Sequence, residues 1–262
     1  MSAIVTDRTQ PAPSVSAVLP AYNEEVVIER SVRQLARVLS SLAPDFEIIV
    51  TDDGSQDRTG EILARLAEHE PELCLRVVTH EHNQGYGAAL ASGFDAAVKD
   101  LVFFTDGDKQ FDAWELTGLL PAIEPGVDLV IGWRRKRADS PLRLLNAWGW
   151  KQLVNCLFGY TARDVDCAFK LFRRRVWQSL TVRSRGATFS AEFLIKARRL
   201  GFSVVELPVN HYPRTGGSPT GARPAVIARA FKELFQLWWS LDRDLARDPR
   251  AAAMLSSPRP LR

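Results

Sequence analysis

The chain has few cysteines and a small net charge, and these two features argue against disulfide-rich, zinc-binding and nucleic-acid-binding proteins. It also has no internal repeat. Cys74, Cys156 and Cys167 are an odd number of cysteines without paired metal-ligand spacing. They argue against a disulfide framework and a zinc centre, and favour reduced thiols in a cytosolic setting. The net charge of +3 over 262 residues is too small to indicate nucleic acid as a partner.

Long apolar runs are also lacking. No stretch reaches the roughly 18 uncharged apolar residues that span a bilayer, so the chain is predicted to lie on a membrane at most and not to cross one. Residues 1–13 lack the apolar core of a signal peptide, which argues against secretion. With 46% hydrophobic and 25% charged residues, the composition is that of a soluble globular protein.

Strand-like and helix-like segments alternate through the first half of the chain. An apolar residue recurs every three or four positions from Ile28 to Leu42, which predicts a helix with one apolar stripe. Such alternation predicts an α/β fold with right-handed βαβ units and a mainly parallel central sheet flanked by helices. The predicted strands are residues 15–19, 46–50, 73–78, 101–105 and 128–131, with helices at about 28–42, 57–66 and 87–98.

The second half contains two helices with a marked apolar side. A basic, tryptophan-rich helix over residues 141–158 fits a membrane surface, and fits equally well packing on the domain or on a second copy. Its apolar side would consist of Leu145, Trp148, Trp150, Leu153, Leu157 and Phe158. The last helix could dimerise or meet a membrane through a face of Ile227, Phe231, Leu234, Phe235 and Trp238.

These elements predict the domain organisation. Short strands at 168–172 and 203–207 and a helix at 188–200 complete the fold. The termini are rich in Pro, Ser, Ala or Arg, which is typical of disordered ends. We therefore expect a disordered leader over residues 1–13, one domain over 14–222, an amphipathic helix over 223–245 and a flexible tail over 246–262.

The most informative segment is LVFFTDGDKQ, residues 101–110. An apolar run typical of a buried parallel strand leads directly into Asp106 and Asp108. Ligands of open α/β sheets bind at the carboxyl ends of the strands. Two carboxylates that point the same way repel each other unless a cation neutralises them, and Mg²⁺ bound to a substrate diphosphate would do so. The alternative is a polar strand end with an Asp-Gly turn.

Two further strand ends carry polar groups. In LPAYNEE, residues 19–25, Tyr22 offers a flat face for a base, and Asn23 and Glu24 can hydrogen-bond it. The alternative is a helix start with Asn23 as N-cap. In TDDGSQD, residues 51–57, acids suit a nucleobase or ribose, whereas the alternative is a tight turn with Asp57 capping the next helix.

A glycine-containing segment, HNQGYGAAL, follows at residues 82–90. Its glycines allow close backbone approach to a ligand, but it matches neither the Walker pattern nor GxGxxG. The four histidines are scattered along the chain. His80 and His82 alternate on one strand end and could form a metal pair, although ordinary solvation is the favoured interpretation.

Taken in order and spacing, the motifs PAYNEE, DDGSQD, HNQGYGAALASG and FFTDGDKQFD resemble glycosyltransferase family 2, which has the GT-A fold. The later segments DVDCAFKLFRR, FSAEFLIKA and RTGGS resemble one branch of it. That branch moves a sugar from a nucleotide sugar to a polyprenyl phosphate, as the dolichyl-phosphate mannose and glucose synthases do. The resemblance covers roughly residues 14–220.

The resemblance implies a role for each matched residue. On the donor side, the base and ribose would be held by Pro20, Tyr22, Glu24 and Asp52, with Asp53 and Gly85 nearby. Mg²⁺ or Mn²⁺ and the diphosphate would be bound by Asp106 and Asp108, with Gln110 as the further ligand. On the acceptor side, phosphates would be handled by Arg134 and Arg214, while Asp164 and Glu192 line the site.

The sequence also departs from the pattern of the family. Many relatives have Ser in place of Trp133 and Gly in place of Ala168, and Lys soon after the Ser of the basic motif, where this chain has Pro219. Because of the last difference, the phosphate contact of that Lys is not carried over to this chain. The sequence CAFK, residues 167–170, is more similar to that of glucose-type than of mannose-type synthases, which favours a UDP-sugar over GDP-mannose as the donor.

The resemblance therefore implies an inverting, metal-dependent transferase with a nucleotide-sugar donor and a polyprenyl phosphate acceptor. Such an enzyme would be cytoplasmic and peripheral at the inner face of the membrane, with a homodimer or a membrane protein as possible partner. One alternative is the same fold acting on a soluble hydroxyl acceptor, which would need Asp164 or Glu192 as general base. A second is a nucleotide-binding module without turnover.

Overall fold

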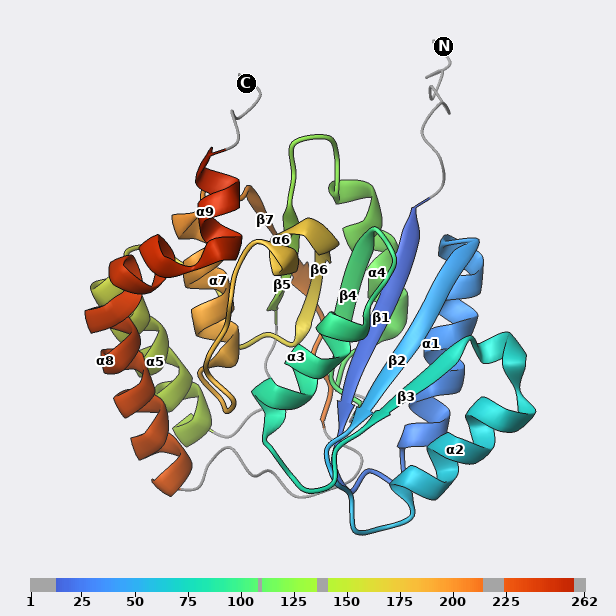
Figure 1. Cartoon of the computed structure of the whole chain (residues 1–262). Helices are drawn as coiled ribbons and strands as arrows, with labels where there is room; N and C mark the ends of the chain where they lie inside the picture. The colour runs from blue at the N-terminus through green and yellow to red at the C-terminus, as the bar shows by residue number, and fades with distance from the viewer. Residues whose placement is uncertain (1–12, 108–109, 136–140, 214–223, 257–262) are drawn as a thin grey trace.

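A seven-stranded sheet runs through the centre of the protein, with helices on both of its faces (Figure 1). The computed structural model describes residues 13–107, 110–135, 141–213 and 224–256. The strands are β1 (Ser14–Ala21), β2 (Asp45–Asp52), β3 (Leu75–Thr79), β4 (Leu101–Thr105), β5 (Leu129–Arg134), β6 (Phe169–Arg173) and β7 (Val204–Val209).

The sheet has the order β3-β2-β1-β4-β6-β5-β7. All strand pairs are parallel except those of β6, which lies antiparallel between β4 and β5. The other six strands therefore run in one direction, and their carboxyl ends share one edge, the lower edge in Figure 1. The predicted α/β fold with a mainly parallel sheet is confirmed.

Two apolar clusters lie on opposite faces of the sheet. The helices are α1 (Ile28–Leu42), α2 (Thr59–His69), α3 (Tyr86–Ala96), α4 (Leu116–Leu119), α5 (Pro141–Phe158), α6 (Arg174–Gln178), α7 (Phe189–Arg199), α8 (Pro224–Arg247) and α9 (Pro249–Ser256). Helices α1, α2 and α4 cover one face and α3 and α5 to α9 the other. Short 3₁₀ turns occur at η1 (Pro71–Leu73), η2 (Ala113–Glu115) and η3 (Leu120–Ala122).

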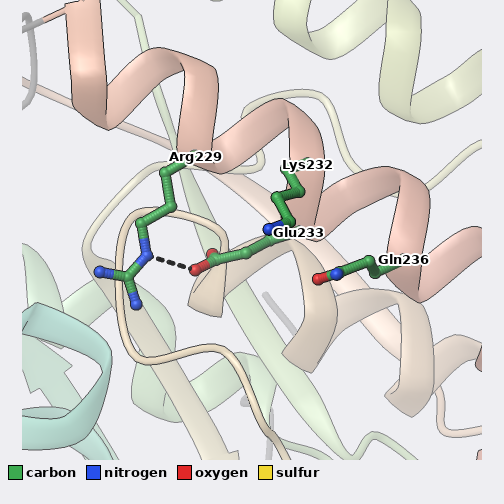
Figure 2. A pocket seen from close by; sticks show the side chains of 4 residues that line it. All are labelled: Arg229, Lys232, Glu233 and Gln236. Carbon is green, nitrogen blue, oxygen red and sulfur yellow. Dashed lines mark hydrogen bonds and ion pairs between the residues drawn. The ribbon is translucent and has the colours of Figure 1, made fainter.

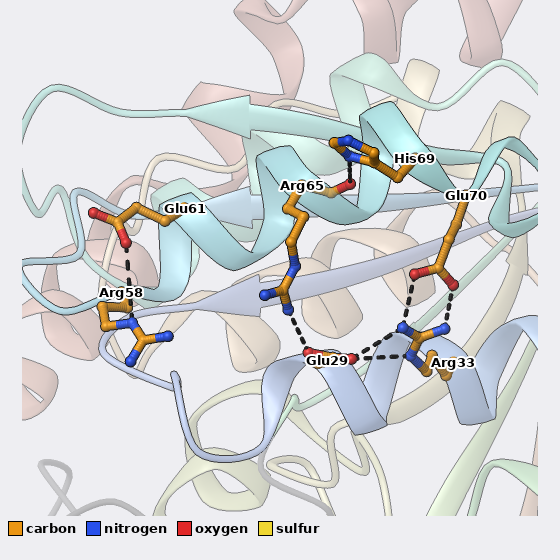
Figure 3. Close-up of polar contacts among 7 residues, drawn as sticks. All are labelled: Glu29, Arg33, Arg58, Glu61, Arg65, His69 and Glu70. Atoms are coloured by element: carbon orange, nitrogen blue, oxygen red, sulfur yellow. Dashed lines mark hydrogen bonds and ion pairs between the residues drawn. The ribbon is translucent and has the colours of Figure 1, made fainter.

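Polar contacts join α1 to α2 on the outer surface (Figure 3). Arg33 bonds Glu29 at 3.0 Å within α1, and it also pairs with Glu70 at the end of α2. Arg65 reaches the same Glu29 at 2.7 Å. Exposed pairs of this kind contribute little each, so the two helices are held mainly by their apolar stripes.

The end of the chain differs from the prediction. Helix α8 continues to Arg247 and α9 follows, so helical structure extends into the segment predicted to be a flexible tail. The reason is burial: Leu241, Leu245 and Ala251 pack into the core on the α3 side of the sheet. Residues 1–12 and 257–262 lie outside the described residues.

The apolar side predicted for residues 141–158 is not a single face. The helix itself has the predicted bounds, but Leu145 and Trp148 are exposed, whereas Trp150, Leu153 and Leu157 pack against the core. Trp148 and Trp150 are two positions apart, and such neighbours on a helix point in nearly opposite directions. In the described part of the chain, none of the helices combines the length and the apolar character needed to span a bilayer.

Phe94 of α3 is the centre of an aromatic cluster that joins the sheet to its helices. Its ring lies 5.2 to 5.3 Å from those of Phe104, Phe172 and Trp177. Replacing Phe94 by Ala should lower the free energy of unfolding by about 3–5 kcal/mol, because it opens a cavity between sheet and helices.

Urea unfolding followed by circular dichroism measures this loss. Phe235→Ala is the matched control, because that ring is 51% exposed on α8 and its removal should change the free energy of unfolding little. Equal losses in the two variants would contradict the central place of Phe94.

Candidate active site

Polar side chains from three neighbouring strands meet at the shared carboxyl edge. Ala21 at the end of β1 lies opposite Asp52 at the end of β2, and Asp106 follows β4 directly. Tyr22 is partly exposed beside this edge, and Glu24 is half-buried. The sheet order therefore places the ends of β2, β1 and β4 next to one another, and with them the polar motifs that follow these strands.

The turn after β1 is tied to the turn after β2. The Asn23 side chain accepts from the Gln56 amide at 2.8 Å, and the Glu24 amide donates to the Thr59 hydroxyl at 2.9 Å. Asn23 is not an N-cap, since α1 begins only at Ile28, and its φ of +55° marks a tight turn. Asp57 accepts from the Thr59 amide, at 3.0 Å, at the start of α2, although the N-cap position itself is Arg58 and not Asp57 as predicted.

Asp53 is the centre of a buried polar network. Its carboxylate accepts from the amides of Gln84 at 2.8 Å and Gly85 at 2.9 Å, and bonds the His80 ring at 2.7 Å. The other ring nitrogen of His80 bonds Ser92 at 2.9 Å. Asp53 therefore shapes the glycine segment before α3. Asp52 is also buried, and it accepts from the Ser55 amide at 3.0 Å.

His80 corrects the expectation of ordinary solvation. Its side chain is buried and bonded on both ring nitrogens. The sequence contained no sign of this, because the partner Asp53 lies 27 positions away. Strand pairing between β2 and β3 brings the two together.

The glycines of residues 82–90 serve a contact within the chain. Gly85 has a φ of +102°, and a Cβ there would lie 2.6 Å from the carbonyl oxygen of Arg185. That same carbonyl accepts from the Gly87 amide at 2.8 Å. The glycines thus allow the segment around Arg185 to pack onto the start of α3, which the sequence did not reveal.

At the end of β4, Asp106 accepts a hydrogen bond of 3.0 Å from the hydroxyl of Tyr86. Tyr86 is a site residue that the sequence motifs contained but did not distinguish. Gln110 donates to the carbonyl of Tyr212 at 3.3 Å, and the Tyr212 amide donates back to the Gln110 carbonyl at 2.9 Å. Asp108 and Arg214, both predicted site residues, lie outside the described residues.

The donor set suits a hard divalent cation. In the part of the chain that the structure describes, no group of three His, Cys, Asp or Glu side chains could hold a metal by itself. Mg²⁺ commonly takes one or two carboxylates and completes its shell with water and substrate phosphates. The carboxylate of Asp106 and the amide oxygen of Gln110 are ligands of that kind.

Arg134 and Asp164 form a nearly buried ion pair at the end of β5. The guanidinium donates two hydrogen bonds of 2.7 Å, from Nε to Oδ2 and from its NH2 group to Oδ1. Burial lowers the pKa of Arg134, but the pairing with Asp164 outweighs it, so the pKa lies above its ordinary value. Next to this pair, the Arg163 guanidinium stacks 3.5 Å from the centre of the Trp133 ring.

Glu192 is buried in the interior of the protein. Lys196 bonds Oε1 at 2.6 Å, and the amides of Arg183 and Ser184 donate to its two oxygens at 3.0 and 2.8 Å. These bonds hold residues 181–185, the segment that packs onto α3. The role of Glu192 on the acceptor side stays a prediction.

A shallow hollow on α8 lies beside residues 181–188. Figure 2 shows the four side chains that line it, Arg229, Lys232, Glu233 and Gln236. Glu233 bonds Arg229 at 2.8 Å and the hydroxyl of Thr188 at 2.7 Å. Of the predicted site residues that the structure describes, none lines this hollow.

Known proteins resemble the chain in sequence. The model of glycosyl transferase family 2 matches residues 16–181. Glycosyltransferase AglD of Haloferax volcanii is 33% identical over 239 residues, which cover 87% of this chain and 37% of that protein. Dodecaprenyl-phosphate galacturonate synthase of Rhizobium johnstonii is 29% identical, covering 85% and 65%. The undecaprenyl-phosphate 4-deoxy-4-formamido-L-arabinose transferase of Pseudomonas aeruginosa is 31% identical, covering 79% and 60%.

Solved structures resemble it in fold. Glucosyl-3-phosphoglycerate synthase from Mycobacterium tuberculosis, crystallised with Mn²⁺, UDP and phosphoglyceric acid, has a TM-score of 0.69 at 22% identity, covering 86% of this chain and 78% of that one. The same enzyme with Mg²⁺ and UDP has a TM-score of 0.67 at 21% identity, covering 86% and 79%. The predicted GT-A fold is thereby confirmed.

The chain spans 37 to 65% of the length of these curated relatives. The match to the family model nevertheless extends from β1 to the segment after α6, and so includes the acidic ends of β1, β2 and β4. The chain belongs to glycosyl transferase family 2.

Proposed function

We propose that this protein is an inverting glycosyltransferase that moves a sugar from a nucleotide sugar, preferably a UDP-sugar, to a polyprenyl phosphate. The observation that carries this proposal is the meeting of Asp52, Asp53 and Asp106 at one sheet edge in a chain of this family. Two of the relatives are named as transferases or synthases of polyprenyl-phosphate sugars.

On the donor side, Tyr22 would stack on the base, and Pro20, Glu24 and Asp52 would hold base and ribose. Asp53 acts indirectly, because its carboxylate is bonded to the backbone before α3 and so orders Gly85. Asp106, Asp108 and Gln110 would hold Mg²⁺ or Mn²⁺. When bound, the cation would neutralise the charge that develops on the departing nucleoside diphosphate.

The ion pairs of Asp164 and Glu192 favour a phosphate over a hydroxyl acceptor. A hydroxyl needs a general base, but Asp164 binds Arg134 through both oxygens and Glu192 is buried against Lys196. An anionic phosphate needs no base and instead needs a fixed cation. Arg134, held charged by Asp164, is such a cation. Its Nε and one NH2 hydrogen bind Asp164, so its NH1 group and the remaining NH2 hydrogen would donate to the phosphate oxygens.

In the proposed reaction, a phosphate oxygen of the lipid attacks the anomeric carbon from the face opposite the diphosphate. The new carbon–oxygen bond forms as the bond to the nucleoside diphosphate breaks, and the configuration inverts. Arg134 and Arg214 would orient the attacking phosphate. Tyr86 would hold the Asp106 carboxylate through its hydroxyl.

Asp106→Asn should reduce sugar transfer by about 100-fold or more, a barrier increase of about 2.7 kcal/mol, because a neutral amide binds a divalent cation poorly. The assay supplies undecaprenyl phosphate, Mg²⁺ or Mn²⁺ and UDP-, GDP- and dTDP-sugars, and detects glycosylated lipid by mass spectrometry. The control is Asp112→Asn, which changes a carboxylate at the start of η2 and should retain transfer. Full turnover of Asp106→Asn, or of the unchanged protein in a metal chelator, would contradict the metal role.

The same assay tests the acceptor. We expect a lipid-linked sugar from one donor class. If the donor is hydrolysed without a lipid product, and Asp106→Asn abolishes this hydrolysis, the protein is still a glycosyltransferase but its acceptor is not the lipid. Neither product nor hydrolysis in folded protein would favour the nucleotide-binding module.

The proposed site of action is a membrane surface, met through α8. Leu234, Leu237 and Leu241 of α8 face the core, which leaves Phe231, Phe235, Trp238 and Trp239 exposed on another side of the helix. Trp148 of the neighbouring α5 is also exposed. Helix α8 begins at the lower side of Figure 1, where β1, β2 and β4 end. Tryptophan prefers the bilayer interface, and the exposed Lys232 and Arg243 would meet anionic headgroups.

Replacing Phe235, Trp238 and Trp239 together by Ser should abolish flotation with liposomes that contain anionic lipid, because the apolar face no longer inserts. Trp114→Ser is the matched control, since that ring is 48% exposed but lies on η2. The rival explanation is that this face of α8 forms a dimer, which light scattering tests. If the triple variant dissociates a dimer and leaves flotation unchanged, the face binds a second copy of the chain.

A further inference from the structure

Lys170 is a completely buried cation that the proposed reaction does not use. It lies on β6, opposite Phe104 of β4 and Ile131 of β5. These two strands lead to Asp106 and Arg134. Burial lowers the pKa of Lys170. A buried ammonium is costly unless it is well bonded, so its bonding partners indicate what it does.

The ammonium supports a turn from the inside. Its Nζ donates to the carbonyl of Val165 at 3.2 Å and to the carbonyl of Cys167, and it lies 5.2 Å from the centre of the Phe104 ring. The turn is closed by a 3.3 Å bond from the Cys167 amide to the Asp164 carbonyl. Two carbonyls of the turn therefore accept from one buried amine.

The same turn carries the carboxylate that holds Arg134. Besides the two side-chain bonds, Asp164 Oδ2 accepts from the Arg134 amide at 3.2 Å, so the turn fixes both the guanidinium and the end of β5. We propose that Lys170 is a positioning residue, whose ammonium sets the 164–167 turn and thereby places the Asp164–Arg134 pair for the acceptor phosphate. The role of the pair rests on the proposed function, whereas the support of the turn does not.

The first test reads the turn without using activity. Cys167 is buried, and burial raises the pKa of its thiol to about 12, so it should react slowly with thiol reagents. In a background with Cys74→Ser and Cys156→Ser, which removes the two exposed thiols, Lys170→Met should speed modification of Cys167 by dithionitrobenzoate about tenfold or more, by local opening.

Leu237→Ala in the same background controls for general destabilisation, because it opens a cavity on α8 rather than at the turn. When circular dichroism shows that both variants are folded, modification of Cys167 should be faster only in Lys170→Met. Equal rates in the two variants, or an unchanged rate in Lys170→Met, would overturn the proposal.

The second test reads the coupling to Asp164. Lys170→Met should lower kcat for sugar transfer by about 10- to 100-fold, the scale of a displacement of about 1 Å, and leave the donor KM unchanged. In an Asp164→Asn background the same substitution should have almost no further effect, since both changes act through one turn. If the kcat losses of Lys170→Met and Asp164→Asn multiply in the double variant, Lys170 does not act through Asp164 and the proposal is overturned. If the unchanged protein transfers no sugar, the proposed function fails, and the Cys167 rates still decide the role of Lys170.

Discussion

The structure depends on one electrostatic constraint: acidic side chains gather at a single sheet edge, and each buried one needs hydrogen-bond donors. Asp53 is satisfied by two backbone amides and a histidine, and Asp164 by the guanidinium of Arg134. Because burial penalises an unpaired charge strongly, these bonds fix the loops that carry the donors. The acids therefore build the loops around the site as well as taking part in the proposed chemistry.

The acids differ in what they bind. Asp53, Asp164 and Glu192 accept from backbone amides or cations and so shape loops, and Asp106, directly after β4, accepts from the hydroxyl of Tyr86. A carboxylate bound to a cation through both oxygens is a poor proton acceptor. The pairing therefore weighs against base catalysis on a hydroxyl and supports the use of an acceptor that is already charged.

Buried lysines have a comparable part in the second half of the domain. Lys170 bonds two carbonyls of the 164–167 turn, and Lys196 bonds Glu192 and the carbonyl of Thr181. Each lysine organises irregular backbone, where no strand or helix supplies the missing partners. Rigid loops at a strand edge allow a fold of regular elements to hold substrates in a defined geometry.

The sequence by itself determined the alternation of strands and helices, the α/β class and the acids at the ends of β1, β2 and β4. Apolar periodicity and local motifs contain that information, and the family resemblance added roles for the residues. Only the tertiary structure decided that His80 is bound to Asp53, that Glu192 is buried, and which side of α5 packs on the core. Each of these depends on a partner far away in the chain, and strand order and helix packing, rather than local pattern, set which distant residues meet.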